Sequence, residues 1–284
     1  MAVNYEELKK GGLLKQKQKD KFVMRLRGQA GNFTSEQLRQ IADLADKYGQ
    51  SYVHLTTRQG VEIPWTDVKD TTEIREEVGK MGLANGTCGP RIRTVLACPG
   101  NEICRYGLVD TKKMGIALDE AFFGRIVPKK TKVAVCGCSN SCTKPQENDF
   151  GFAGVVEPVL DVEKCIGCGV CERVCPGKAI RMEDGKPVYD AAKCIWEGNC
   201  IASCPTDAWS AKRVGYRAYA GGKIGRFPQL GQVVKEYLTE EEVIPTGEKI
   251  IKAFENLHQT GERIADTLKR VGVQAFTEEM EREE

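Results

Sequence analysis

Cys98-Pro-Gly-Asn-Glu-Ile-Cys104 and Cys138-Ser-Asn-Ser-Cys142 are the stretches from which the organisation of this chain follows. Their cysteines are spaced C-x5-C and C-x3-C, and the segment between them is long enough to return to the same place. Thiolates are soft ligands, so a set of four favours zinc or an iron–sulfur cluster. Neither spacing is the C-x2-C of a zinc knuckle, and the pattern therefore favours an iron–sulfur cluster.

At these residues the sequence resembles the sulfite and nitrite reductase family, in which a siroheme is joined to a [4Fe–4S] cluster. The resemblance implies that the last cysteine of the pattern bridges the cluster and the siroheme iron. It also assigns Asn140 to the cofactor site. Cys136 competes with Cys138 as a ligand, but the C-x3-C spacing favours Cys138 and leaves Cys136 in the core. The implied cluster ligands are Cys98, Cys104, Cys138 and Cys142, with Cys142 as the bridge.

Basic side chains lie in further segments that are similar to the family. These segments are Leu55-Thr-Thr-Arg58-Gln59, Arg93-Thr-Val-Leu and Val127-Pro-Lys-Lys130-Thr-Lys132. In the family such cations hold the substrate oxyanion, which implies catalytic roles for Arg58, Arg93, Lys130 and Lys132. Without the resemblance, Arg58 would be a solvated charge at a strand end, and Lys129-Lys130 would be an ordinary solvated surface.

Two downstream segments, Asp149-Phe-Gly-Phe152 and Gly221-Gly222-Lys223, also match the family. Consecutive glycines allow the backbone to approach a bulky ligand, and nearby cations can meet the carboxylates of siroheme. We therefore assign Gly222, Lys223 and Arg226 to cofactor binding. Alone, the same stretch would indicate a surface hairpin.

A second cysteine-rich region begins with Cys165-Ile-Gly-Cys168-Gly-Val-Cys171-Glu-Arg-Val-Cys175-Pro176, the C-x2-C-x2-C-x3-C-P run of bacterial two-cluster ferredoxins. A second run, Cys194-Ile-Trp-Glu197-Gly-Asn-Cys200-Ile-Ala-Ser-Cys204-Pro205, has Glu197 where a cysteine is expected. The fourth cysteine of each run serves the other cluster. One predicted cluster is held by Cys165, Cys168, Cys171 and Cys204, and the other by Cys175, Cys194 and Cys200.

The fourth ligand of that second cluster has three candidates: a Glu197 carboxylate, solvent, or no ligand because the cluster is [3Fe–4S]. We favour Glu197 because it occupies the ligand position itself. A carboxylate is a harder donor than a thiolate and would shift the cluster potential. In the alternative, Glu197 faces water and the cluster has three irons.

The composition limits the class of protein. The chain has 284 residues, with 42 basic and 40 acidic residues, which gives no case for nucleic-acid binding. We find no run of about 18 apolar residues and no signal-peptide pattern, and we expect a cytoplasmic protein without membrane contact. The 13 cysteines are clustered, which indicates metal sites rather than disulfides.

We predict an α+β fold with three parts. Residues 1–82 form a ferredoxin-like half-domain, residues 83–156 and 213–284 form the siroheme and [4Fe–4S] domain, and residues 157–212 form an inserted two-cluster ferredoxin domain.

Cys88 is predicted to be a packed core residue. The tail from Thr277 onward is predicted to be solvated or frayed. Strands are predicted at 21–27, 52–57, 93–97 and 133–136, and helices at 34–48, 67–81, 107–123 and, capped by Thr239, from 240 onward.

The resemblance implies a siroheme-dependent reduction of sulfite to sulfide. Electrons would pass from a donor ferredoxin or flavoprotein through the ferredoxin clusters to the siroheme-coupled cluster. One alternative is reduction of nitrite to ammonia, and another is a non-catalytic iron–sulfur electron-transfer subunit. Four basic residues favour sulfite slightly, and the intact cysteine pairs argue against the electron carrier.

We also predict a dimer, formed with a second copy or with a homologous subunit. Many relatives contain two related halves, whereas this chain has one copy that carries both the cluster cysteines and the basic residues. The basic residues of one protomer would then face the siroheme that is held by the cysteines of its partner.

Overall fold

In the computed structural model, which describes residues 4–282, the N-terminal unit is built around strand β2 (Lys21–Arg27). Its alternating apolar and basic residues are alternately buried and half-buried, as the sequence predicts. The sheet has the order β1 (Leu13–Lys15), β2, β4 (Gly60–Asp67), β3 (His54–Leu55), and β5 (Ala84–Asn85) also pairs with β2. The predicted strand at 52–57 is thus shortened to two residues.

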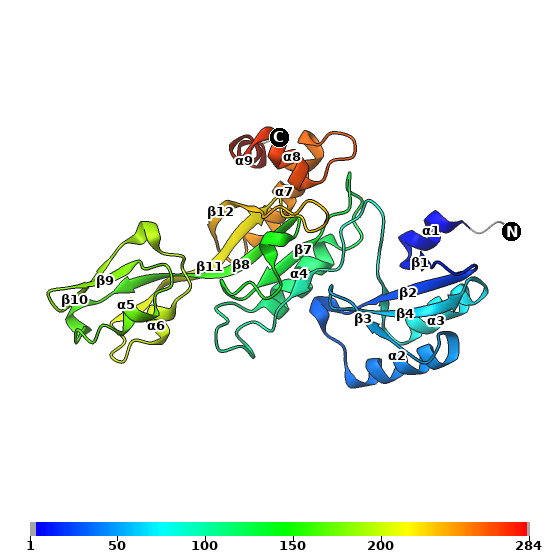
Figure 1. The fold of residues 1–284 in the computed structure, drawn as a ribbon, viewed down its shortest axis with the longest axis horizontal. Coiled ribbons are helices and arrows are strands. Elements are labelled where there is room, and N and C mark those ends of the chain that lie inside the picture. Colours follow the sequence, from blue (N-terminus) through cyan, green and yellow to red (C-terminus); the bar gives the residue numbers. More distant parts are fainter. Residues whose placement is uncertain (1–3, 283–284) are drawn as a thin grey trace.

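Helices α2 (Ser35–Tyr48) and α3 (Thr71–Lys80) pack on the same apolar face of this sheet, where they share a core with Phe22, Met24 and Leu26. Thr34 caps α2 through a hydrogen bond that its hydroxyl accepts from the Gln37 amide at 3.0 Å. A short helix, α1 (Tyr5–Lys10), precedes the first strand. The unit is the blue and cyan end of Figure 1.

The central body contains a five-stranded sheet in the order β12-β11-β8-β7-β6. Strands β6, β7 and β8 are parallel, and β8, β11 and β12 are antiparallel. Helices α4 and α7 pack against one face through Phe122, Phe150 and Phe254. The bounds are β6 (Leu96–Ala97), α4 (Thr111–Phe122), β7 (Val133–Cys136), β8 (Phe150–Leu160), β11 (Trp209–Ala220), β12 (Gln232–Leu238) and α7 (Val243–Leu257).

The C-terminal segment differs from the sequence prediction. Residues 277–280, expected to be solvated or frayed, instead form the last turn of α9 (Val273–Met280), which follows α8 (Ile264–Val271) and buries Phe276 and Met280 in the body. Residues 283–284 of that tail lie outside the described residues. Thr239 does not cap α7, because its own backbone amide donates to the Glu242 carboxylate at 2.7 Å and the helix begins after Glu242.

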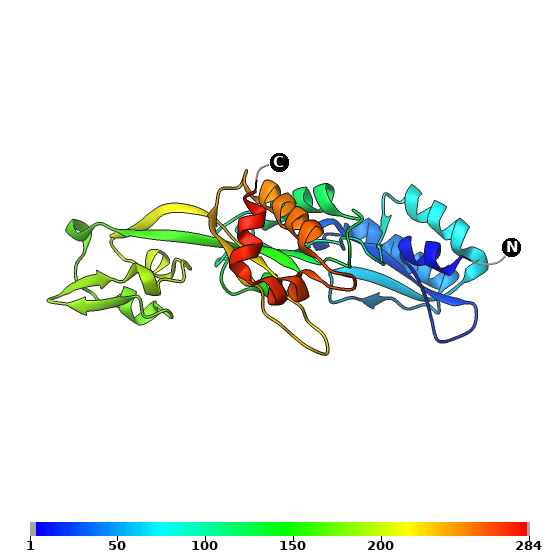
Figure 2. The same cartoon turned by 90° about the horizontal axis from the view of Figure 1, so that it is seen from above.

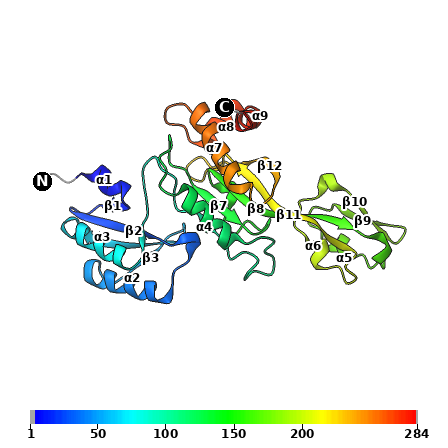
Figure 3. The same cartoon turned by 180° about the vertical axis from the view of Figure 1, so that it is seen from behind.

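Residues 161–208 form a small lobe, here called the cysteine lobe, at the end of the molecule remote from the N-terminal unit (Figures 1 and 3). Strands β8 and β11 run into it without interruption, and Figure 2 shows this extended connection. The predicted domain boundaries at 157 and 212 thus fall inside paired strands. The lobe contains α5 (Val170–Val174), β9 (Ile180–Glu183), β10 (Lys186–Tyr189) and α6 (Asn199–Ala202).

The cysteine lobe is an internal repeat with an offset of 29 residues, seen in its 3-10 turns at Val162–Lys164 and Ala191–Lys193. Left-handed glycines precede both helices, Gly169 at φ 69° and Gly198 at φ 80°. The offset makes Glu197 the counterpart of Cys168.

The N-terminal unit is attached to the body by a buried ion pair between Arg27 on β2 and Asp119 on α4. Asp119 is fully buried and also accepts the Val95 amide at 3.1 Å. The Arg27 guanidinium stacks on Phe123, 3.6 Å from the ring centroid. None of the described helices is long and apolar enough to span a bilayer.

Replacing Asp119 by alanine should therefore destabilise the protein by about 3–5 kcal/mol, because Arg27 would stay buried without its counter-charge. Urea unfolding would measure this, with Asp43→Ala on the exposed face of α2 as the matched control. Equal unfolding midpoints for the two variants would contradict the proposed attachment.

Candidate functional site

One pocket gathers the four basic residues that the sequence predicts to be catalytic. Arg58, Arg93, Lys130 and Lys132 all line it. They come from the turn before β4, the segment before β6 and the segment before β7. The pocket also contains Arg25, which was not predicted because an alternating strand pattern does not distinguish a site residue from a solvated one. Arg25 is itself paired with Glu62.

The two arginines are fixed by backbone carbonyls. Arg58 donates to Asn148 Oδ1 at 2.9 Å and to the carbonyl oxygens of Thr94 at 2.5 Å and Val133 at 3.2 Å. Arg93 donates to the carbonyls of Thr87 and Gly89. Fixed donors need little reorganisation when an anion enters, so the geometry is suited to oxyanion binding.

The pocket has an excess of positive charge. Burial lowers the pKa of Arg58 to about 10, and the neighbouring Arg93 and Arg25 act in the same direction, whereas Asp149 opposes them. Burial also lowers the pKa of Lys132, with further repulsion from Arg58. The pKa of Arg58 stays well above neutral pH, so its guanidinium is cationic there, and a bound anion would relieve the repulsion among the pocket cations.

A second pocket adjoins the first and contains Cys142. Arg58 and Lys132 line both pockets, and Ile224 lies on the wall of the second. These two cations therefore share a pocket with Cys142 within one chain. The Arg58 guanidinium donates to the carbonyl of Thr94, just before β6, and to that of Val133 in β7. The predicted arrangement across two protomers stays a prediction.

The two cysteine loops meet because β6 and β7 are parallel neighbours, with Ala97 opposite Val135. Cys98 follows the end of β6, and its sulfur accepts the Gly137 amide at 3.1 Å. A Cβ at Gly137 would lie 3.3 Å from the Gly100 Cα, so glycines permit the close approach. Burial raises the pKa of the Cys138 thiol, and so do Cys98 and Cys104, which places these three cysteines together.

The remaining cysteines of this region have different surroundings. Cys142 is exposed on the same loop as Cys138. Cys136 is buried at the end of β7, and a hydrogen bond with Cys98 lowers its pKa and raises that of Cys98. Its burial agrees with a core position, as does that of Cys88, which accepts from Arg25 at 3.4 Å.

The donors at the two loops suit an iron–sulfur cluster. Within residues 4–282, no three side chains of His, Cys, Asp or Glu are arranged around a single metal ion. A cubane is larger than one ion and accepts more widely separated thiolates. The all-sulfur set and the amide donated to Cys98 fit a [4Fe–4S] cluster held by Cys98, Cys104, Cys138 and Cys142.

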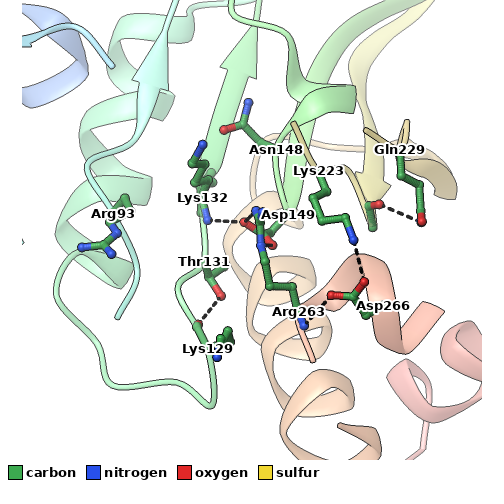
Figure 4. Close-up of polar contacts among 12 residues, drawn as sticks. Arg93, Lys129, Thr131, Lys132, Asn148, Asp149, Lys223, Gln229, Arg263 and Asp266 are labelled. Atoms are coloured by element: carbon green, nitrogen blue, oxygen red, sulfur yellow. Dashed lines mark hydrogen bonds and ion pairs between the residues drawn. The ribbon is translucent and has the colours of Figure 1, made fainter. Parts of the chain in front are cut away.

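The other residues predicted to contact the cofactor have the following surroundings, and their cofactor roles stay predictions. A Cβ at Gly222 would lie 2.3 Å from the carbonyl oxygens of Gln146 and Asn148, so protein packing alone requires this glycine. Lys223 is paired with Asp266 at 2.5 Å (Figure 4). Arg226 is exposed in the loop between β11 and β12, and Asn140 lines a separate pocket with Cys138 and Glu197.

In the cysteine lobe, Cys175, Cys194 and Cys200 lie near one another, since the first two contribute, after burial, to raising the pKa of Cys200 to about 12. Cys165 acts similarly on Cys171.

Glu197 points to the body of the protein. Its Oε2 accepts from the Ser139 hydroxyl at 3.4 Å, and its buried Oε1 has no partner among the described residues. Burial raises the pKa of this carboxyl. Ligation of iron by Glu197 stays a prediction.

Comparisons with known proteins agree with this geometry. Residues 88–284 match the family described as "Nitrite and sulphite reductase 4Fe-4S domain", and residues 14–81 match "Nitrite/Sulfite reductase ferredoxin-like half domain". The chain is 37% identical over 262 residues to the coenzyme F420-dependent sulfite reductase of Methanocaldococcus jannaschii, covering 91% of this chain but 42% of that protein. It is 31% identical over 218 residues to one of the anaerobic sulfite reductase subunits of Salmonella typhimurium, covering 70% of this chain and 64% of the relative.

Solved structures share the fold. Dissimilatory sulfite reductase I superposes with a TM-score of 0.77 at 22% identity, covering 93% of this chain and 70% of that chain. The NirA protein of Mycobacterium tuberculosis superposes with a TM-score of 0.68 at 18% identity, covering 96% of this chain and 45% of that chain. The two family matches cover most of the sequence, and residues from both line the cation pocket, so this chain belongs to the nitrite and sulfite reductase family.

Proposed function

We propose that this chain is a siroheme-dependent sulfite reductase subunit that reduces sulfite to sulfide. The observation that carries the proposal is the pocket of fixed cations that adjoins Cys142 in the same chain. When bound, siroheme and its coupled [4Fe–4S] cluster supply the electrons that no side chain can provide. Cys98, Cys104, Cys138 and Cys142 would hold the cluster, with Cys142 as the shared ligand.

The side chains of the pocket bind and orient the anion and deliver protons. Arg58 and Arg93 can donate to sulfite oxygens with the N–H groups that their protein partners leave free, and those partners hold the two guanidinium groups in place. Lys130 and Lys132 add ammonium groups that can donate protons as S–O bonds break. Because the pKa of Lys132 is lowered, its ammonium gives up a proton more readily than an exposed lysine would.

Nitrite is the second candidate, since the matched family includes both activities. The pocket collects five cationic side chains, of which Arg25 is neutralised by Glu62. Four remaining charges suit sulfite, the more highly charged anion, and the named relatives described above are sulfite reductases.

We infer that the cysteine lobe carries two further clusters and receives electrons from a ferredoxin or flavoprotein donor. This inference is supported by the internal repeat of the lobe, in which one cysteine run contains α5 and the other contains α6. The second run lies against the body, where the Val156 amide donates to the Trp196 carbonyl at 2.9 Å and Glu197 meets Ser139. The site of Cys175, Cys194 and Cys200 would therefore be the nearer one to the Cys138 loop.

The protein purified without oxygen should show siroheme absorption bands and should produce sulfide from sulfite with a reduced dye as electron donor. Cys142→Ser should lose both the siroheme bands and the sulfide production, because the bridging thiolate is gone. Absorption spectra and siroheme, iron and sulfide analyses would measure this. A brown protein without siroheme bands would leave only an electron carrier.

Lys132→Met should lower kcat/KM for sulfite by about 100-fold while siroheme content is retained, because a fixed cation at the developing charge is lost. Lys129→Met is the matched control, since Lys129 is exposed in the same segment and does not line the pocket. Similar losses in both variants would argue that the whole segment, rather than Lys132, matters.

Cys200→Ser should remove the iron of one lobe cluster and leave siroheme in place, because Cys200 lies in the lobe core and away from the cation pocket. Cys88→Ser, a buried cysteine outside every predicted ligand set, should keep its iron. Iron analysis with EPR spectroscopy would separate the two. Unchanged iron in Cys200→Ser would refute the lobe assignment.

A further inference from the structure

Directly behind the cation pocket lies an ion pair that the oxyanion chemistry does not itself use. The Asp149 side chain is fully buried, and that of Arg263 is 9% exposed. Arg263 donates from Nε to Asp149 Oδ1 at 2.9 Å and from a terminal nitrogen to Oδ2 at 2.6 Å (Figure 4). Asp149 immediately precedes β8, whereas Arg263 immediately precedes α8, so the pair joins the C-terminal helices to the sheet.

The acidic partner of this pair is connected to two pocket cations. Asp149 Oδ2 also accepts the backbone amide of Lys132 at 2.8 Å. Its neighbour Asn148 accepts from the Arg58 guanidinium at 2.9 Å. Burial raises the pKa of Asp149, and the hydrogen bonds from Arg263 oppose that effect. A movement at residues 148 and 149 would thus displace both pocket cations.

The charges of the pair also act on the pocket. Asp149 attracts both Arg58 and Lys132, and Arg263 repels both. An unneutralised Asp149 carboxylate would compete with an entering anion for the same two cations, since charges interact strongly across a poorly solvated interior. Arg263 removes that competition by taking both carboxylate oxygens.

We propose that Arg263 is a positioning residue for the oxyanion site. By pairing with both carboxylate oxygens of Asp149, it leaves the charges of Arg58 and Lys132 available to the substrate. The proposal rests on the proposed function for the identity of the substrate, and on the contacts above for the rest. It assigns the C-terminal helices a part in anion affinity, although they contribute no side chain to the pocket.

Binding of sulfate to the purified cofactor-containing protein, measured by isothermal titration calorimetry at low ionic strength, tests this proposal without any turnover. Arg263→Gln should weaken sulfate binding roughly tenfold, because one negative charge is released near the pocket. Asp149→Asn should leave sulfate affinity unchanged or raise it, because the competing charge is removed. The double variant should return to within about threefold of the wild type.

Arg270→Gln is the matched control. It removes a guanidinium from α8 itself, where Arg270 pairs with Glu262 near the surface, and the variant should bind sulfate like the wild type. Should Arg263→Gln fail to fold, Asp149→Asn and the double variant still decide the question.

Weakened sulfate binding in both Asp149→Asn and the double variant would overturn the proposal. If the pair had a purely structural role, every variant that breaks it would bind sulfate more weakly. Sulfate does not enter the proposed reaction, so the expected binding pattern in a protein that cannot reduce sulfite would overturn the proposed function alone. Failure of the wild type to bind sulfate would overturn the present proposal.

Discussion

The parallel pairing of β6 with β7 is the constraint on which this site depends. Neighbouring parallel strands end at the same edge of a sheet, so the loops that follow them must meet there. Cys98 follows one strand and Cys138 the other, and glycines at the crossing let the backbones touch. Thr94, just before β6, and Val133 in β7 receive the Arg58 guanidinium on their carbonyls. One local arrangement therefore brings the predicted sulfur ligands and Arg58 together.

The cation pocket shows the usual conflict between function and stability. Desolvated guanidinium and ammonium groups crowd one another, as the lowered pKa values of Arg58 and Lys132 indicate. The surrounding fold compensates with backbone carbonyls and with the buried pair of Asp149 and Arg263. Such an arrangement is costly for folding alone but suits a site that must hold a small, highly charged anion.

Features encoded by nearby residues could be predicted from the sequence. The alternating residues of β2, the capped helix α2 and the apolar strand β7 were all predicted close to their observed bounds. Cysteine spacing and the family resemblance identified the four cations that share a pocket. Features that depend on distant partners were not predictable. The ion pair of Lys223 with Asp266 joins residues that lie far apart along the chain, and the burial of Phe276 and Met280 in α9 depends on packing that the charged tail does not reveal.

Diffraction at the iron absorption edge from anaerobically grown crystals would test the central claim most directly. The account predicts an iron cluster bounded by Cys98, Cys104, Cys138 and Cys142, with a further iron on the far side of Cys142. That iron would lie in a macrocycle that faces Arg58 and Lys132. Iron confined to the cysteine lobe, with no macrocycle beside Cys142, would contradict it.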